Sequence, residues 1–196
     1  MKTSLLILSY AGMAAGGWLG SLALGHNPFA FASPGWLGMH GVASALSSAG
    51  IGVCLGALTV GATREIVRRA SWGRALHQAL RPAVGRASDR SLLAVALASA
   101  LGEEILFRGL LVPILGVVLS AVLFGALHQV RGPGRWAWMG WATVMGLLFG
   151  AVLAATGSLA GPLAAHAMIN AANLRFLRDT DPQATPKPLG GLLRRI

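Results

Sequence analysis

The chain has 196 residues, of which 55% are hydrophobic and only 11% are charged, and its formal net charge is +10. A soluble domain carries about a quarter charged residues, so this composition excludes an ordinary water-soluble domain. The positive charge does not indicate a nucleic-acid-binding protein either, because the basic residues lie between long apolar stretches and form no polar domain of their own. The sequence therefore predicts a protein of the lipid bilayer.

Six apolar stretches follow one another, each near the roughly 20 residues that a helix needs to cross a bilayer. In chain order they are 4–24, 37–62, 91–112, 114–130, 136–155 and 158–177. Pro113 is expected to end or kink the third stretch. The first stretch is long for the apolar core of a signal peptide, and another span follows at once, so we interpret it as a retained helix. The expected fold is an all-α, polytopic membrane bundle of six transmembrane helices.

The distribution of Lys and Arg predicts the orientation of this bundle. When both termini are placed in the cytoplasm, all 16 Lys and Arg residues except Arg108 face the cytoplasm, and the outer loop from Gly25 to Trp36 carries no formal charge. The expected parts of the chain are two N-terminal spans (1–62), a basic cytoplasmic loop (63–90), a core of four spans (91–177) and a cytoplasmic tail (178–196).

Arg is used far more often than Lys, which suggests a GC-rich bacterial genome and hence a multi-pass protein of the bacterial inner membrane. Within the basic loop, Trp72 to Leu80 has an amphipathic pattern, and both an interfacial helix on anionic lipid and a solvated loop remain open. His77 is interpreted as a surface residue. The only cysteine, Cys54, is interpreted as a small buried hydrophobic residue, since no disulfide or CxxC zinc site is possible within the chain.

Only two of the six acidic residues, Glu103 and Glu104, lie within an apolar stretch. An ionisable residue there costs a few kcal/mol by insertion scales, so its default interpretation is functional. Glu104 and Arg108 are four residues apart and share a helix face, which allows them to pair. Glu103 points about 100° away around the helix. Low polarity and the adjacent negative charge favour proton uptake by Glu103, as a general base requires.

Two further pairs place polar groups within the apolar stretches. Phe124 and His128 are four residues apart, as are His166 and Asn170. His166 and Asn170 can both donate hydrogen bonds to a developing oxyanion, and His128 could orient a water molecule against Glu103. Each feature alone has a structural alternative, since an intramembrane His or Asn often joins helices and Glu104–Arg108 could be a structural ion pair. The combination of polar groups from three separate spans favours a reaction site.

These residues form the motifs EExxxR (103–108), FxxxH (124–128) and HxxxN (166–170). Together they resemble the CPBP family of intramembrane proteases, which includes the type II CAAX prenyl proteases and bacterial relatives. The resemblance covers the four C-terminal stretches. It implies peptide-bond hydrolysis within the membrane, with water activated by Glu103 and placed by His128. His166 and Asn170 would stabilise the oxyanion, and Glu104 and Arg108 would support the site.

The cofactor and the substrate are less directly indicated. Glu103, His128 and His166 could in principle bind zinc, but HExxH is absent and the third motif ends in Asn, so we favour a metal-free site without a cofactor. The expected substrate is a membrane-associated protein. The chain is shorter than the eukaryotic CAAX proteases, and a bacterium usually lacks prenylated CAAX proteins, so that substrate is not carried over. The branch that the chain most resembles is the myxosortase type, which removes a Cys-containing C-terminal anchor.

Two alternatives to a protease remain: a non-catalytic membrane scaffold or chaperone that keeps the motifs, and a proton-coupled transporter. Against the transporter, no inverted repeat is visible and the polar groups lie in one half of the chain. One geometric difficulty also remains. Glu103 lies ~20 Å along its helix from Arg90, whereas His128 lies just before the turn at Arg131. For the two to meet, the third helix must begin below the membrane surface, tilt or kink.

Overall fold

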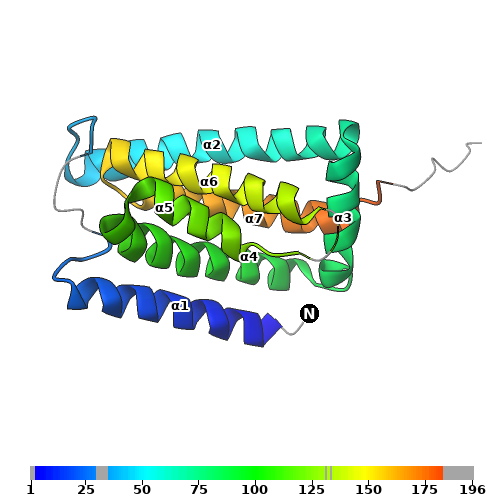
Figure 1. The fold of residues 1–196 in the computed structure, drawn as a ribbon, viewed down its shortest axis with the longest axis horizontal. Helices are drawn as coiled ribbons and strands as arrows, with labels where there is room; N and C mark the ends of the chain where they lie inside the picture. Colours follow the sequence, from blue (N-terminus) through cyan, green and yellow to red (C-terminus); the bar gives the residue numbers. More distant parts are fainter. Residues whose placement is uncertain (1–2, 30–34, 131, 133, 183–196) are drawn as a thin grey trace, which may run out of the picture.

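The computed structural model describes residues 3–29, 35–130, 132 and 134–182. These residues form helices and connecting loops, so the predicted all-α class is confirmed. The elements are α1 (Thr3–Ala23), α2 (Gly41–Arg69), α3 (Ser71–Val84), α4 (Asp89–Glu104), the π-helix η1 (Ile105–Leu111), α5 (Val112–Leu127), α6 (Arg135–Thr156) and α7 (Ala160–Asp179). The long helices lie side by side, and the short helix α3 crosses one end of the bundle (Figure 1).

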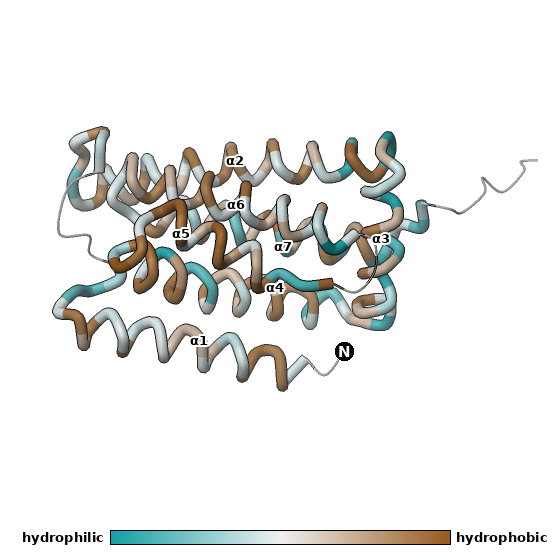
Figure 2. Tube along the Cα trace, viewed as in Figure 1, coloured by the Kyte–Doolittle hydropathy of each residue, from teal (hydrophilic) through white to brown (hydrophobic). Residues whose placement is uncertain are grey.

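Four helical segments of the described chain are long and apolar enough to cross a membrane: α1, α2, the run Asp89–Leu127 and α6. Hydrophobic residues extend along their length, and hydrophilic residues gather around α3 (Figure 2). The first, second and fifth predicted stretches correspond to α1, α2 and α6, whereas the third and fourth share one helical run. The chain is therefore a multi-pass membrane protein, while the count of six spans and the cytoplasmic placement of both termini remain predictions.

The helix α7 is not among those four segments, because its sequence carries polar residues that lower its hydropathy. It lies against α2, α4 and α6 inside the bundle, so these side chains face protein more than lipid. Irregular and polar groups are tolerated at membrane depth where protein buries them. The position of α7 thus explains how the sixth predicted stretch can hold His166 and Asn170.

The chain reverses direction inside its longest helical run, at Gly116. Gly116 has φ 76° and ψ 169°, a conformation that is accessible only to glycine without strain. After this residue α5 runs back along η1, so the rings of Phe107 and Phe124 lie 4.9 Å apart. The hydroxyl of Ser120 donates to the carbonyl oxygen of Phe107 at 3.2 Å. In a straight helix Phe107 and Phe124 would be separated by ~25 Å, so the two halves form a tight hairpin.

Pro113 was predicted to end or kink the helix; it does not end it, because the preceding turn widens into a π-helix that accommodates it. The N–H of Val112 bonds to the carbonyl of Phe107, which is the i→i−5 pattern of a π-helix. Pro113 has no N–H for the carbonyl of Gly109, four residues earlier. That oxygen lies instead 3.3 Å from the hydroxyl of Ser21 and 3.0 Å from Nε2 of His26. The end of α1 therefore stabilises the π-helix.

The predicted basic loop 63–90 is largely helical, since α2 continues to Arg69 and α3 follows directly. The interpretation of His77 as a surface residue is wrong, because its side chain is only 3% exposed. Its Nε2 lies 2.9 Å from the carbonyl of Thr180, and its ring contacts the edge of Phe176. These contacts hold α3 against the C-terminal turn of α7.

Small residues on one face of α2 bring this helix close to α7. The hydroxyl of Ser48 accepts a hydrogen bond from the N–H of Gly161 at 2.9 Å. A Cβ at Gly52 would overlap the carbonyl oxygen of Gly161. Cys54 lies on the opposite, exposed face of α2, so its interpretation as a buried residue is wrong. The small-residue face fixes the position of α7 and of its polar side chains.

Substitution of Gly52 with alanine is expected to lower the free energy of unfolding by about 1–3 kcal/mol, the usual cost of overpacking, because α2 and α7 must move apart. A denaturing-detergent titration measures this change. Gly50→Ala is a matched control, since a Cβ at Gly50 would meet nothing within 4 Å. Equal stability of the two variants would contradict the close approach of α2 and α7.

Candidate active site

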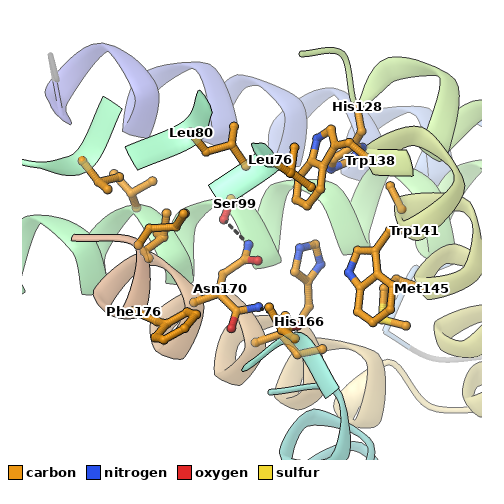
Figure 3. Close-up of a pocket in the computed structure, with 18 of the residues that line it drawn as sticks. Leu76, Leu80, Ser99, His128, Trp138, Trp141, Met145, His166, Asn170 and Phe176 are labelled. Carbon is orange, nitrogen blue, oxygen red and sulfur yellow. Dashed lines mark hydrogen bonds between the residues drawn. The ribbon is translucent and has the colours of Figure 1, made fainter. Parts of the chain in front are cut away.

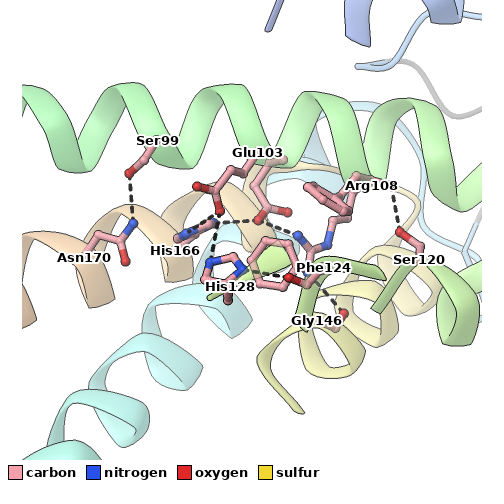
Figure 4. Close-up of polar contacts among 11 residues, drawn as sticks. Ser99, Glu103, Arg108, Ser120, Phe124, His128, Gly146, His166 and Asn170 are labelled. Carbon is pink, nitrogen blue, oxygen red and sulfur yellow. Dashed lines mark hydrogen bonds and ion pairs between the residues drawn. The ribbon is translucent and has the colours of Figure 1, made fainter. Parts of the chain in front are cut away.

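Three segments that are distant in the sequence bring ionisable side chains together inside the bundle (Figure 4). Glu103 and Glu104 end α4, His128 directly follows α5, and His166 lies in α7. Oε2 of Glu103 is 3.7 Å from Nε2 of His128 and 3.7 Å from Nε2 of His166. The motifs predicted that His128 and His166 share a site with Glu103. The structure places both imidazoles next to the Glu103 carboxylate.

The reversal at Gly116 explains how His128 reaches the depth of Glu103. Glu103 lies ~21 Å along the helix from Asp89, at 1.5 Å per residue. After Gly116 the helix continues only to Leu127, which is ~17 Å and therefore too short to cross a hydrocarbon core of ~30 Å. The fourth apolar stretch thus ends part-way through the bundle, so the third helix needs no unusual starting depth.

Glu104 and Arg108 form a buried ion pair beneath Glu103. Nη1 of Arg108 lies 3.0 Å from Oε1 of Glu104, and the two side chains are 1% and 0% exposed. Oε1 of Glu104 also accepts a hydrogen bond from Nδ1 of His166 at 2.7 Å. A buried charge is tolerated when it is paired and hydrogen-bonded. Glu104 therefore links the EExxxR motif directly to the first residue of the HxxxN motif.

The Arg108 guanidinium is surrounded on its remaining sides by acceptors and aromatic rings. Its Nη2 donates to the carbonyl oxygen of Gly146 at 3.2 Å. Its Cζ lies 4.6 Å from the ring centre of Phe124 and 5.1 Å from that of Phe149. Cations favour the faces of aromatic rings, so these contacts offset part of the cost of burial. The Phe of the FxxxH motif thus packs against the Arg of EExxxR.

Hydrogen bonds to Nδ1 determine which face each imidazole presents to Glu103. Nδ1 of His128 lies 2.7 Å from the carbonyl oxygen of Phe124, which can only accept, so this nitrogen carries the proton. Nδ1 of His166 donates in the same way to Glu104. Both Nε2 atoms are therefore left to face Glu103. Such a partner on the second nitrogen fixes ring orientation and tautomer.

Asn170 lies one helical turn after His166 and is oriented by α4. Its Nδ2 donates to the hydroxyl of Ser99 at 2.9 Å, and Ser99 in turn donates to the carbonyl of Ala96 at 3.1 Å. Ser99 precedes Glu103 by four residues and shares its helix face. The amide of Asn170 is thus held on the same side of the bundle as Glu103 and His166 (Figure 4).

Residues 90–172 match the family model described as type II CAAX prenyl endopeptidase, Rce1-like. This part of the chain is an Rce1-like region. It extends from the start of α4 into α7 and contains all the predicted site residues, namely Glu103, Glu104, Arg108, His128, His166 and Asn170. Comparison with curated proteins and with solved structures found no match to the chain. The Rce1-like family consists of CAAX-type intramembrane proteases, so a membrane protease is confirmed in these general terms.

A cavity of about 330 Å³ lies beside the polar residues of the Rce1-like region. Glu103, His128, His166 and Asn170 line one part of it, and most of the remaining lining is apolar. Figure 3 shows His128, His166 and Asn170 together with Leu76 and Leu80 of α3 and Phe176 of α7. The cavity therefore joins the carboxylate of Glu103 to the end of the bundle that α3 covers.

Ser99 and Tyr10, two polar residues that line this cavity near Glu103, were not predicted as site residues. Ser99 could have been predicted from the sequence, because it lies four residues before Glu103 and therefore on the same face of α4. Tyr10 of α1 also lines the cavity, although it lies far outside the matched residues. No spacing rule relates Tyr10 to the motifs, so only the packing of α1 reveals it.

The alternative zinc ligands, Glu103, His128 and His166, do lie together. Within the described ranges, however, no group of three or more His, Cys, Asp or Glu side chains has an arrangement suited to a metal ion. A zinc site needs ligand atoms about 2.0–2.2 Å from a common centre. The metal-free site stays a prediction, and the proposed reaction uses only this chain's residues and water.

Proposed function

We propose that the protein is an endopeptidase of the bacterial inner membrane that hydrolyses a peptide bond with a water molecule activated by Glu103. The observation that carries this proposal is the position of Oε2 of Glu103. This atom is buried, accepts no hydrogen bond from any described residue and lies 3.7 Å from two imidazole nitrogens. A carboxylate oxygen in this position can accept a hydrogen bond from water, and Nε2 of His128 can accept the second.

In the proposed reaction, the oxygen of this water attacks the carbonyl carbon of the substrate while Glu103 takes one of its protons. The C–N bond then breaks, and Glu103 returns the proton to the leaving nitrogen. The products are a new carboxylic acid, which keeps the second proton of the water, and a new amine, and Glu103 is restored as a carboxylate. The same side chain thus acts first as general base and then as general acid.

The negative charge that develops on the substrate oxygen needs donors, and the site offers two on α7. We assign this role to Nε2 of His166 and to the amide of Asn170, which line the same cavity. Because Nδ1 of His166 already donates to Glu104, Nε2 can donate only when the ring is protonated.

The proposed substrate is a membrane-associated protein that is cut next to a C-terminal anchor, as processing of the myxosortase type would require. The mainly apolar lining of the cavity supports an apolar peptide segment as the bound part. A prenyl group is not required by this proposal. The side chains of Leu76, Leu80 and Val84 on α3 would contact the substrate at the end of the cavity away from Glu103.

Mass spectrometry of membrane-protein C-termini tests this function directly. Cells depleted of the protein are expected to accumulate substrates that retain their C-terminal anchors, and re-expression should restore the shorter forms. The purified enzyme should then cleave the accumulated protein in proteoliposomes, with the same rate before and after chelation. Identical C-termini in both cell types would contradict the proposed function. Loss of cleavage on chelation, restored by zinc, would contradict the metal-free mechanism alone.

A further inference from the structure

A residue outside the Rce1-like region faces its central carboxylate. Tyr10, the only tyrosine of the chain, lies in the middle of α1. It lines the same cavity as Glu103, His166 and Asn170. The matched family region begins at residue 90, so α1 is not part of it. The site is thus built from more of the chain than the three motifs indicate.

The backbone of α1 lies directly against the turn of α4 that holds Glu103. A Cβ at Gly102, the residue before Glu103, would lie 2.5 Å from the carbonyl oxygen of Tyr10. About two turns further along α1, a Cβ at Gly17 would lie 2.9 Å from Cα of Leu106. Two glycines therefore allow the helices to approach closely, and this contact fixes the position of Tyr10 relative to Glu103.

The hydroxyl of Tyr10 and the carboxylate of Glu103 line the same cavity and lie near enough to interact electrostatically. The other donors around Glu103 have different partners. Arg108 bonds to Glu104 and to the carbonyl of Gly146. Nδ1 of His128 is bonded to Phe124. Tyr10 is therefore, with Nε2 of His166 at 3.7 Å, one of the two groups near Glu103 that are left to donate to its carboxylate.

We propose that Tyr10 is a positioning residue for the reaction and donates a hydrogen bond to the Glu103 carboxylate. This inference rests on the proposed function of Glu103 as general base. The hydrogen bond restricts rotation of the carboxylate, so that Oε2 stays directed toward His128 and His166. The first helix of the chain is thereby part of the reaction site.

Substitution of Tyr10 with phenylalanine keeps the ring and removes the hydroxyl. In proteoliposomes this variant is expected to lower kcat about 10- to 100-fold, the value of a hydrogen bond to a charged group, and to leave KM unchanged. The matched control is Ser9→Ala, because Ser9 is exposed on the same helix and bonds only to the carbonyl of Leu5. An unchanged kcat in Tyr10→Phe, or an equal loss in Ser9→Ala, would overturn the proposal.

A second measurement needs no turnover. Because the chain has one tyrosine, the tyrosine doublet in its ultraviolet resonance Raman spectrum reports on the Tyr10 hydroxyl alone. The doublet is expected to indicate a strong donor in the wild type and to lose this character in Glu103→Ala. The same spectrum in both proteins would refute the contact. If the wild type cleaved nothing, the proposed function and the role of Tyr10 would both fail, although the spectrum would still show whether the two side chains meet.

Discussion

Glu103→Gln is expected to lower the rate of peptide-bond cleavage by about 10⁴-fold, the upper end of what general acid–base catalysis contributes. Glutamine has nearly the same shape as glutamate, but its amide can neither take a proton from water nor return one to the leaving nitrogen. Both proposed steps therefore fail together. Glu103 is buried, and an isosteric side chain keeps its packing, so the unfolding transition in detergent should change little. Initial rates in proteoliposomes measure the effect.

Glu65→Gln provides a matched control for this substitution. Glu65 lies at the basic end of α2, where its partly exposed carboxylate pairs with Arg68. Its loss should leave the cleavage rate unchanged, because surface ion pairs contribute little and the residue does not line the cavity. Normal turnover by Glu103→Gln would remove the general-base assignment. Full complementation of cells by that variant would instead favour a non-catalytic scaffold.

Replacing Arg108 with leucine is expected to lower the free energy of unfolding by about 3–5 kcal/mol. The substitution leaves the charge of Glu104 buried without its cation and leaves the carbonyl of Gly146 without its donor. It also removes the guanidinium that packs between Phe124 and Phe149. A denaturing-detergent titration of the purified protein measures the loss.

A double variant separates the ion pair from the other contacts of Arg108. Glu104→Gln removes the uncompensated charge, so the combination with Arg108→Leu should recover much of the lost stability. The double variant should still cleave slowly, because Nδ1 of His166 no longer bonds to an anion. If the single and double variants were equally unstable, the charge of Glu104 would not be the cause of the instability.

The polar residues of the site could be predicted from the sequence because the bilayer penalises them strongly. Glu103, Glu104 and Arg108 stand out in an apolar stretch, and helical spacing predicts the Glu104–Arg108 pair that the structure contains. The positions of α1, α2 and α6 followed from hydropathy for the same reason. Helical spacing and the free-energy cost of a charged residue in lipid depend only on nearby residues, so both can be recognised in the sequence without knowledge of the fold.

The reversal at Gly116 could not be predicted in this way. Glycine in an apolar stretch is compatible with a helix and with a turn, whereas Pro113 gives a strong local signal for a break. The contacts that decide whether the helix continues past Pro113 come from a distant part of the chain. Ser21 and His26 bind the carbonyl of Gly109, which Pro113 cannot bond. The burial of His77 and the exposure of Cys54 likewise depend on which side of each helix meets a neighbour.

The part of α5 that follows Gly116 is too short to cross the bilayer, and this affects how the protein is inserted into the membrane during synthesis. The C-terminal end of α5, at His128, leaves non-helical backbone at the depth of Glu103, where lipid offers no hydrogen bonds. On the ribosome, α5 emerges before α6 and α7, which supply the protein surroundings for that backbone. The α4–α5 hairpin can therefore settle in the bilayer only when the last two helices have been inserted, and a chain truncated before α6 should be recognised as incomplete and degraded.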